Sequence, residues 1–421
     1  MVSLNPFKRL NWRNILLFLS VIGPGIITAA VDNDAGGITT YSLAGAHFGY
    51  GFLWTLIPIT VALILVQEMS ARLGAVTGKG FSDLIRERFG VRWTFYILLA
   101  LFIANLGNTL AEFSGIAAST EIFGVSKYIT VPTSALAVWF LVVKGSYKKI
   151  ENIFLVASLF YATYVISGLM ASPNWGPILK AVATPVISFH ADYIAMLIGM
   201  VGTTIAPWMQ FYIQSSVSDK KIQFKDYWVT RWDVIIGCLI TDLVAFFVVV
   251  ACAETIYRHG LNIETAKDAA LALGPLAGKW ASMLFAFGLF NASIFAATIL
   301  PLSTTYSICE GMGWESGLDY SFKEAPAFYS IFTGIIIVGA GLILLPNAPL
   351  ISIMYWSQVV NGMLLPFVLV IILWLINDKR LMGKYVNGPL FNFLTWTLTL
   401  VMVILSVLLV FSTLFPHLFG Q

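Results

Sequence analysis

Residues 23–37 of the chain read GPGIITAAVDNDAGG, so glycine and proline interrupt an apolar segment that also carries two carboxylates, Asp32 and Asp34. The whole apolar segment, 14–45, would measure about 48 Å as one helix at about 1.5 Å per residue. That length exceeds a hydrocarbon core of about 30 Å, so we predict a break near the centre of the helix. Gly and Pro often only kink a packed helix, but a carboxylate at this depth is costly and usually functional.

The composition of the 421-residue chain indicates a lipid environment. Hydrophobic residues make up 58% of it and charged residues only 11%, whereas soluble domains carry about 25% charged residues. A formal net charge of +3 gives no support for nucleic-acid binding. The three cysteines lie in or beside apolar runs without metal-site spacing, so no disulfide framework is predicted.

Eleven apolar stretches are candidates for spanning a bilayer, which needs about 20 residues each. The first runs past the length of a signal peptide and contains carboxylates, so we predict no cleavable signal. The fold class expected is therefore an all-α integral membrane protein. The predicted spans are 14–45, 52–71, 93–120, 131–143, 152–171, 192–217, 232–254, 280–308, 328–345, 351–376 and 391–415.

Lys and Arg are distributed unevenly between the two sides of this predicted bundle. With the N-terminus in the cytoplasm, nineteen of the 24 fall on the cytoplasmic side, as the positive-inside rule requires. An odd number of spans then places the C-terminus outside. We predict a multi-pass protein of the cell (plasma) membrane with a cytoplasmic N-terminus. The five cations on the other side are Lys127, Lys180, Arg258, Lys267 and Lys279.

A second span, 192–217, is interrupted in the same way as the first. It contains GTTIAPW at 202–208, with no charge between Asp192 and Asp219. The second break lies five spans after the first. An odd number of crossings reverses the direction of the chain, so the two broken helices run in opposite directions. This is the pattern of transporters with inverted repeats. We predict one transmembrane transporter domain of two five-span repeats and an eleventh span. Their boundaries are about 14–171 for repeat one, 192–376 for repeat two and 391–415 for the extra span.

Unwound backbone at the two breaks would face the midplane of the bundle, where it is tolerated only inside protein or beside a water-filled cavity. Freed carbonyls are hard oxygen ligands, and the C-terminal ends of half-helices are partially negative. Both features favour a cation. Asp34 is the residue we predict to bind it directly, because it is a carboxylate at the centre of the first break.

Other polar groups lie within the predicted spans. Asp32 faces another side of the break or lines the path to it. Glu112 and Asp242 are either functional or paired with a neighbouring helix, and the residues alone leave both alternatives open. Gln358 offers an uncharged oxygen for direct or water-mediated contact. Each is costly in lipid and is expected to face the bundle interior.

Two further features bear on these assignments. Glu68 and Arg72 are four residues apart on one helix, which favours a structural ion pair. Histidine is the side chain best suited to proton transfer near neutral pH, yet none lies near either break. The four histidines fall at loops or span ends, at His47, His190, His259 and His417.

Several stretches together resemble the NRAMP family of divalent-metal transporters, over most of the chain and in the same order. The resemblance implies an inverted five-plus-five helix bundle with broken helices 1 and 6 and an extra span. It also implies transport of divalent metal ions. The stretches are Gly23–Tyr50, SARLG at 70–74 with VTG at 76–78, SQVV at 357–360 with LPF at 365–367, RLMG at 380–383, and Val386–Asn387.

The departures from the family pattern are as informative as the matches. The family's Asp-Pro-Gly-Asn reads DAGG at 34–37 here, and its Met-Pro-His reads APW at 206–208. Its Asp-x-x-Glu in the third span becomes Thr109 to Glu112. An arginine expected early in the ninth span has no counterpart at 326–329. These substitutions resemble those of the NRAMP-related magnesium transporters.

The chemistry of the substitutions is compatible with that branch. A thioether favours transition metals, whereas Mg²⁺ prefers oxygen ligands and keeps several waters. Small residues at Gly37 and Ala206 are expected to enlarge the cavity for a hydrated ion. The resemblance thus implies a metal site of Asp34, Gly37, Val31, Thr203, Ala206 and Gln358, the backbone carbonyls serving at Val31 and Thr203, with Asp32, Glu112, Thr109 and Trp208 around it or along the pathway.

The function expected is secondary transport of Mg²⁺, and also Mn²⁺, by alternating access without obligatory proton coupling. Trp208 and Thr109 stand where the family has titratable groups. A membrane potential of 100 mV contributes about 4.6 kcal/mol for a double charge. Alternatives are a proton-coupled Mn²⁺/Fe²⁺ symporter, a sodium-coupled organic-solute carrier of the same bundle type, and a passive channel.

An intramembrane enzyme is the remaining alternative, but no metalloprotease or nucleophile-elbow motif is present. We therefore predict that the chain is not an enzyme. No cofactor is expected, because the metal ion is the transported substrate. The predicted partners are that ion and the lipid bilayer, and the sequence leaves the oligomeric state open.

Overall fold

The computed structural model describes residues 24–144, 158–220, 222, 227–261, 263, 279–318 and 320–414, and in these residues every regular element is a helix. The elements are α2 (Pro24–Asp32), α3 (Ala35–Phe48), α4 (Leu53–Thr77), α5 (Phe81–Ile122), α6 (Lys127–Lys144), η1 (Ser158–Tyr161), α8 (Ala162–Met170), α9 (Trp175–Ala183), α10 (Ala191–Thr204), α11 (Pro207–Asp219), α12 (Tyr227–Thr255), η3 (Tyr257–His259), α14 (Lys279–Met312), α15 (Pro326–Ile343), α16 (Leu350–Ile376), α17 (Lys379–Met382), η4 (Gly383–Tyr385) and α18 (Pro389–Leu414).

Each of the eleven predicted spans coincides with a helix or a pair of helices. Among the described residues, 8 helices are long and apolar enough to cross a membrane, α10 and α11 counting as one. The three other spans correspond to α2–α3, α6 and η1–α8. Parts of the first and fifth predicted spans, 14–23 and 152–157, lie outside the described residues.

Both predicted helix breaks are present. The first separates α2 from α3 at Asn33 and Asp34, and the second separates α10 from α11 at Ile205 and Ala206. Local chemistry explains each restart. Asp34 has an extended backbone and caps α3 with its side chain, as N-cap residues do. Pro207 occupies the first turn of α11, where its missing N–H costs nothing.

The long helix α5 contains a third interruption, at Gly90. Its φ of 79° and ψ of 166° lie outside the helical region, in a conformation that glycine adopts without a steric penalty. The helix therefore turns before the predicted span at 93–120 begins. Residues 81–89 form a separate short helical segment at the end of the bundle.

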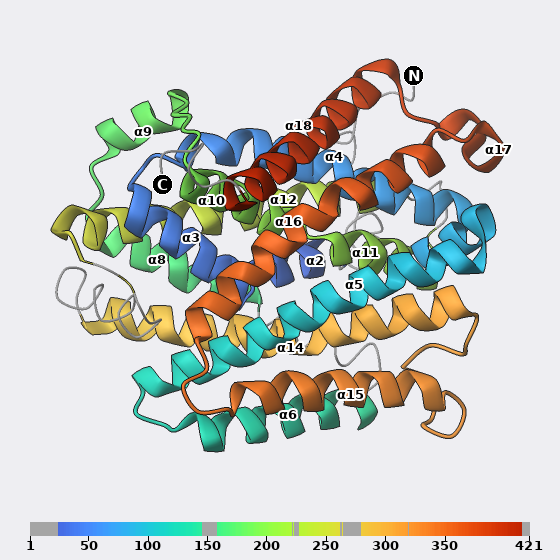
Figure 1. Ribbon diagram of the computed structural model, residues 1–421, viewed down its shortest axis with the longest axis horizontal. Coiled ribbons are helices and arrows are strands. Elements are labelled where there is room, and N and C mark those ends of the chain that lie inside the picture. Colours follow the sequence, from blue (N-terminus) through green and yellow to red (C-terminus); the bar gives the residue numbers. More distant parts are fainter. Residues whose placement is uncertain are drawn as a thin grey trace, which may run out of the picture.

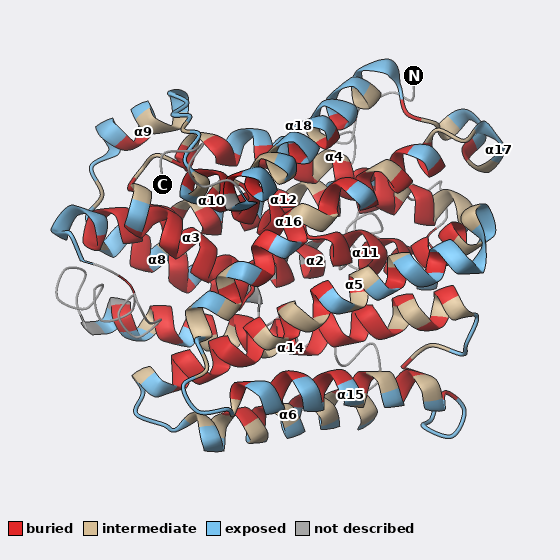
Figure 2. Cartoon of the chain, viewed as in Figure 1, coloured by how far each residue is buried: buried red, intermediate tan, exposed pale blue. Residues whose placement is uncertain are grey.

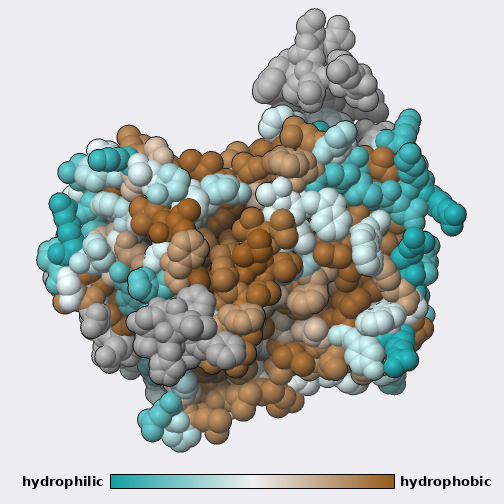
Figure 3. Space-filling view, turned by 45° about the horizontal axis from the view of Figure 1, so that its top comes forward, coloured by the Kyte–Doolittle hydropathy of each residue, from teal (hydrophilic) through white to brown (hydrophobic). Residues whose placement is uncertain are grey.

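The helices are arranged as a bundle elongated along the spans. Figure 1 shows α16, α5 and α14 as neighbouring rods, with α6 and α15 along one edge. The broken helices lie inside, and Figure 2 shows buried residues concentrated there. In the most apolar stretch of 191–219, 94% of the residues are buried. In that of α18 only 22% are, so α18 lies at the periphery of the bundle. Hydrophobic side chains cover the middle of the surface between two hydrophilic ends (Figure 3).

This architecture is an inverted five-plus-five helix repeat with an eleventh span, α18. The second broken helix contacts the last helix of its own repeat through glycines. A Cβ atom at Gly202 of α10 would lie 2.2 Å from the Gln358 carbonyl oxygen of α16. A Cβ atom at Gly362 of α16 would lie 2.4 Å from the Ile198 carbonyl oxygen. The two backbones therefore touch, which fixes the second break relative to Gln358.

Candidate functional site

Asp34 lies at the first break, where it is only 4% exposed. Its Oδ1 atom accepts a hydrogen bond of 2.5 Å from the Gly37 N–H. The N-terminal end of α3, with its aligned N–H groups, stabilises a negative charge at this position. The carboxylate is therefore held in a fixed place inside the bundle, as the sequence predicted for a residue at the break.

Glu112 of α5 reaches the same helix end. Its Oε2 atom accepts a hydrogen bond of 3.2 Å from the Ala35 N–H, and its side chain is buried and neighbours the carboxyl group of Asp34. In the described residues Glu112 forms no ion pair. The alternative of a partner on a neighbouring helix is thus found as a hydrogen bond to α3 and not as an ion pair, and Glu112 lies in the polar group around Asp34.

This hydrogen bond also affects the Val31 carbonyl. In a continuous helix the Ala35 N–H would be donated to the carbonyl four residues earlier, which is that of Val31. Here Glu112 takes this N–H instead, and α2 ends at Asp32. The Val31 carbonyl is one of the last carbonyls of α2, which have no partner within their own helix, and its role as an oxygen ligand stays a prediction.

Gln358 of α16 lies directly against the first turn of α3. A Cβ atom at Gly36 would lie 1.8 Å from its Nε2 atom. Its Oε1 atom accepts a hydrogen bond of 2.9 Å from Asn361, which donates a second one of 2.9 Å to Asn108. The amides of Asn108 and Asn361 were missed by the sequence analysis. The available signal was their position one helical turn from Glu112 and Gln358.

Thr203 of α10 lies beside the first break, opposite Gly37. A Cβ atom at Gly37 would lie 2.7 Å from the Asp32 carbonyl oxygen and 2.9 Å from the Thr203 Oγ1 atom. The expectation that the small residue at Gly37 enlarges a cavity is therefore wrong, because these neighbours fill the space. Thr203 Oγ1 has no hydrogen-bond partner in the described part of the chain, so its hydroxyl is a further oxygen at the site.

The remaining predicted residues take structural positions, Ala206 and Trp208 at the second break and Thr109 within α5. The Ala206 carbonyl accepts a hydrogen bond of 3.2 Å from the Met209 N–H, which begins α11. Trp208 is buried, and its ring packs 6.2 Å from that of Tyr212. The Thr109 hydroxyl donates to a carbonyl of its own helix at 2.9 Å. Thr109 is therefore occupied within α5 and does not extend the polar group.

A cavity of about 1410 Å³ opens at the end of the bundle where α3 terminates. His47, Glu121 and Asp192 are among its lining residues. A smaller pocket follows α3 inward and is lined by residues that include Ser42 and Ile38. Ile38 is one helical turn from Asp34, so these hollows approach the break along α3.

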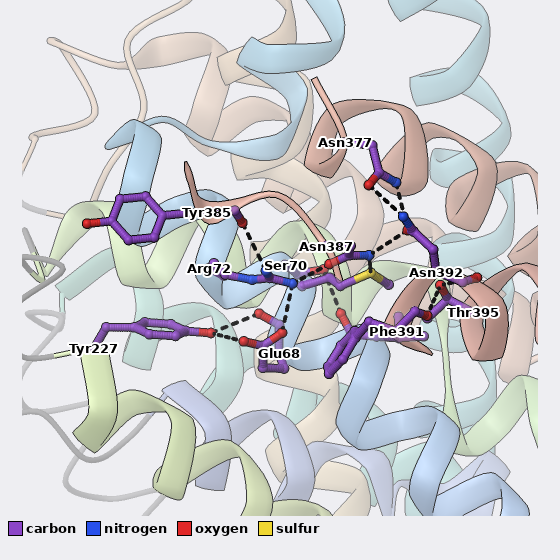
Figure 4. A network of polar contacts seen from close by, with 12 residues as sticks. Glu68, Ser70, Arg72, Tyr227, Asn377, Tyr385, Asn387, Phe391, Asn392 and Thr395 are labelled. Atoms are coloured by element: carbon purple, nitrogen blue, oxygen red, sulfur yellow. Dashed lines mark hydrogen bonds and ion pairs between the residues drawn. The ribbon is translucent and has the colours of Figure 1, made fainter. Parts of the chain in front are cut away.

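The opposite end of the bundle carries a polar network around Arg72 (Figure 4). The predicted pair is confirmed, with Arg72 3.1 Å from Glu68. Arg72 also donates to the Tyr385 carbonyl at 2.9 Å and to the Asn387 side chain. Tyr227 donates to Glu68 at 2.9 Å. The network joins α4 to α12 and to the segment before α18, partners too far away in sequence to be predicted.

Helix α11 is held at the same end by side-chain hydrogen bonds. Gln210 accepts a hydrogen bond of 3.1 Å from Ser70 of α4. Ser215 donates one of 3.0 Å to Glu310 of α14. Because α11 contacts both helices through side chains, it cannot move away from the bundle without breaking these bonds. The site around Asp34 is thus approached by hollows from one end and covered by polar contacts at the other.

The comparisons with known proteins agree with this geometry. The family model described as "Natural resistance-associated macrophage protein-like" (Nramp) matches residues 25–412. The chain belongs to the Nramp family. It is 25% identical over 416 residues to the "Divalent metal cation transporter MntH" of Bacillus subtilis (strain 168), covering 96% of this chain and 93% of the relative. The MntH of Klebsiella pneumoniae is 26% identical over 406 residues, covering 94% and 95%.

Solved structures show the same fold. A crystal structure of the Eremococcus coleocola manganese transporter matches with a TM-score of 0.77 at 21% identity, covering 98% of this chain and 90% of that one. MhsT in complex with L-phenylalanine matches with a TM-score of 0.60 at 15% identity, covering 93% and 97%. The predicted Nramp resemblance and bundle are confirmed. The relatives are named as transporters, in agreement with the prediction that this Nramp chain is not an enzyme.

Proposed function

We propose that this Nramp protein transports divalent metal cations across the cell membrane by alternating access, with Mg²⁺ and Mn²⁺ as substrates. The observation that carries the proposal is the buried Asp34 carboxylate, held at the first helix break by the Gly37 N–H. An ionisable side chain inside a membrane bundle is costly and by default indicates a functional site. Relatives named as divalent metal cation transporters support the same class of substrate.

The metal site we propose contains oxygen ligands from both broken helices. Asp34 provides the charge, the Val31 carbonyl and Thr203 provide neutral oxygens, and Gln358 lies on the first turn of α3. Mg²⁺ prefers oxygen ligands and keeps part of its water shell. Neither Ala206 nor Gly37 brings a side-chain ligand, so no thioether at the second break selects a softer metal.

Transport without obligatory proton coupling is part of this proposal. Trp208 packs against an aromatic ring and the Thr109 hydroxyl is bonded within α5, so neither transfers a proton to or from the site. An inside-negative membrane potential of 100 mV favours the entry of a doubly charged ion by about 4.6 kcal/mol. That driving force is sufficient for accumulation of an ion by a uniporter.

A second candidate is proton-coupled symport of Mn²⁺. Two observations favour it. One is that solved structures of the same fold are named manganese transporters. The other is a soft donor near the approach to the site, because Met354 Sδ accepts a 3.3 Å hydrogen bond from Thr39 of α3, and a thioether favours transition metals over Mg²⁺.

One experiment separates the two candidates. Protein in proteoliposomes is supplied with Mg²⁺, Mn²⁺ or Ca²⁺, with and without a pH gradient, while the internal pH is recorded. We expect Mg²⁺ and Mn²⁺ uptake that responds to the membrane potential and leaves the internal pH unchanged. Acidification that accompanies metal entry, needs the protein and disappears in Asp34→Ala would establish the proton-coupled alternative instead.

We further propose a cytoplasmic N-terminus and one transport domain, with repeats over about 14–171 and 192–376 and an extra span at 391–415. This topology places the large cavity beside His47 and Asp192 on the outer side. The polar network around Arg72 then lies on the cytoplasmic side, where Lys and Arg are concentrated. A cysteine introduced at His47 is expected to react with a membrane-impermeant thiol reagent applied from outside intact cells.

A further inference from the structure

Two carboxylates of the bundle have no role in the site described above. Asp32, the last residue of α2, is 2% exposed, and Asp242 of α12 is 6% exposed. All four of their carboxylate oxygens are buried without a hydrogen-bond partner in the described residues. The hydroxyl of the nearby Thr60 donates to the Leu56 carbonyl at 2.7 Å instead. Buried carboxylates are normally paired or bind a cation.

The packing of α2 on α12 brings the two carboxylates together. A Cβ atom at Gly237 would lie 2.7 Å from the Gly25 carbonyl oxygen and 2.9 Å from the Ala29 Cβ atom. Thr241 donates a hydrogen bond of 2.6 Å to the Ala29 carbonyl. Asp242 follows Thr241, and Asp32 follows Ala29 by three residues. The two side chains therefore emerge at the same level of this helix pair.

The two carboxylates are also electrostatic neighbours. Asp242 and Asp34 are the charged groups near the Asp32 side chain. Asp32 and Asp242 also both act on Tyr41 of α3 and on Cys238 of α12. The carboxylate pair thus lies among α2, α3 and α12, beside the Asp34 site.

We propose that Asp32 and Asp242 form a second binding site for a divalent cation. The proposal rests on the proposed function, because it adds a position for the same class of ion. Two negative charges close together in a dry interior repel each other, and one double charge between them would neutralise both. Two carboxylates with retained waters are a common way to hold Mg²⁺, and Mn²⁺ accepts the same oxygen donors.

The location gives this second site a role in transport. Asp32 precedes Asp34 on the chain and lies on α2, whose first residues extend toward the end that carries the Arg72 network, where Asp233 accepts a 2.6 Å hydrogen bond from the Gly25 N–H. An ion that leaves Asp34 in this direction would meet the carboxylate pair next. The second site is then the next position of the ion on its way to the end that carries the Arg72 network.

The test is to locate bound Mn²⁺ in crystals of the full chain by its anomalous scattering and to count it by titration. We expect two ions in the wild type, one at Asp34 and one between Asp32 and Asp242. Asp242→Asn is expected to remove the second ion and keep the first. Asp34→Ala is expected to do the reverse. Asp83→Asn, which neutralises a partly exposed carboxylate near Arg86, is the matched control and should retain both.

The outcomes distinguish this proposal from the proposed function. A single ion at Asp34 in the wild type, or a second ion that survives Asp242→Asn, would overturn the second site and leave the transport proposal intact. Absence of an ion at both positions would contradict the proposed function itself. If Asp242→Asn does not fold, Asp242→Glu keeps the charge and is expected to retain both ions. Loss of the second ion in a folded Asp32→Asn variant provides an independent check.

Discussion

The two helix breaks are similar in backbone and different in chemistry. The first contains a carboxylate, and Asp34 caps the following helix through the Gly37 N–H. The second consists of Ile205 and Ala206, without a side-chain cap, and the following helix begins with Pro207. A polar side chain therefore restarts one helix, and a fixed proline φ angle restarts the other.

This difference shows that duplicated geometry does not require duplicated chemistry. Both breaks free backbone carbonyls inside the bundle, but only the first supplies charge. The second contributes hydroxyls and close packing, through Thr203 beside Gly37 and through Gly202 against α16. Changes at the first break should therefore remove ion binding, whereas changes at the second should alter fit, selectivity or the rate of opening.

The largest effect is expected at the first break. Asp34→Ala should abolish Mg²⁺ and Mn²⁺ uptake into proteoliposomes, because it removes the charge that attracts the ion. It also removes an N-cap, which costs about 1 kcal/mol of stability. Asp34→Asn is the sharper variant, since asparagine caps helices as well as aspartate does. Asp34→Asn should lose metal uptake while its thermal stability stays nearly unchanged. Uptake like that of the wild type in Asp34→Asn would contradict the site.

A smaller effect is expected where the second break packs on α16. A Cβ atom at Gly202 would meet the Gln358 carbonyl oxygen at 2.2 Å, so Gly202→Ala must push α10 away from α16. We expect a loss of stability of about 1–3 kcal/mol, as for other overpacked positions, and uptake reduced by about tenfold. Gly341→Ala on α15, where a Cβ atom meets nothing within 4 Å, is the matched control. Equal stability and equal uptake of the two variants would show that the contact between α10 and α16 at Gly202 contributes to neither.

The breaks could be predicted because their signals are local. Asp34 and Pro207 mark the starts of half-helices within a few residues. The broken helices and the positions of Asp34, Glu112 and Gln358 in the bundle therefore followed from the sequence. Each is a polar or helix-breaking residue in an otherwise apolar span, and such residues are confined to the interior.

The rest depends on contacts between distant segments. Asn108 and Asn361 are 253 residues apart and meet only because α5 packs on α16. Arg72 meets Asn387, 315 residues away. The space beside Gly37 could not be judged either, because it is filled by the Asp32 carbonyl and Thr203. A glycine in a sequence does not reveal whether its missing side chain leaves space or admits a neighbour.

A moderate change of selectivity is expected from Ala206→Met. A thioether at the second break would favour Mn²⁺ over Mg²⁺, and we expect the ratio of their uptake rates to shift toward Mn²⁺ by several-fold. The double variant Gly37→Asn with Ala206→Met would restore both side chains of the family pattern, but the packing around Gly37 predicts that it loses stability. An unchanged ratio in a folded, active Ala206→Met variant would place selectivity elsewhere.

The smallest effect is expected from Tyr41→Phe, which removes a hydrogen bond between the two broken helices. The Tyr41 hydroxyl and Thr204 Oγ1 are 2.8 Å apart. Thr204 donates its own hydrogen to the Met200 carbonyl at 2.9 Å, so Tyr41 is the donor and Thr204 keeps a partner when the hydroxyl is lost. The change should therefore cost only about 1 kcal/mol.

The measurement for Tyr41→Phe is the initial rate of Mn²⁺ uptake as a function of its concentration. We expect the maximal rate to change by about two- to threefold and the half-saturating concentration to stay near that of the wild type, because the bond links the helices without touching the Asp34 carboxylate. Thr204→Val removes the acceptor and leaves the buried Tyr41 hydroxyl without this partner, so it should lower the maximal rate at least as much, and adding Tyr41→Phe to it should cause no further loss. Additive losses in the double variant would show that the two hydroxyls act separately.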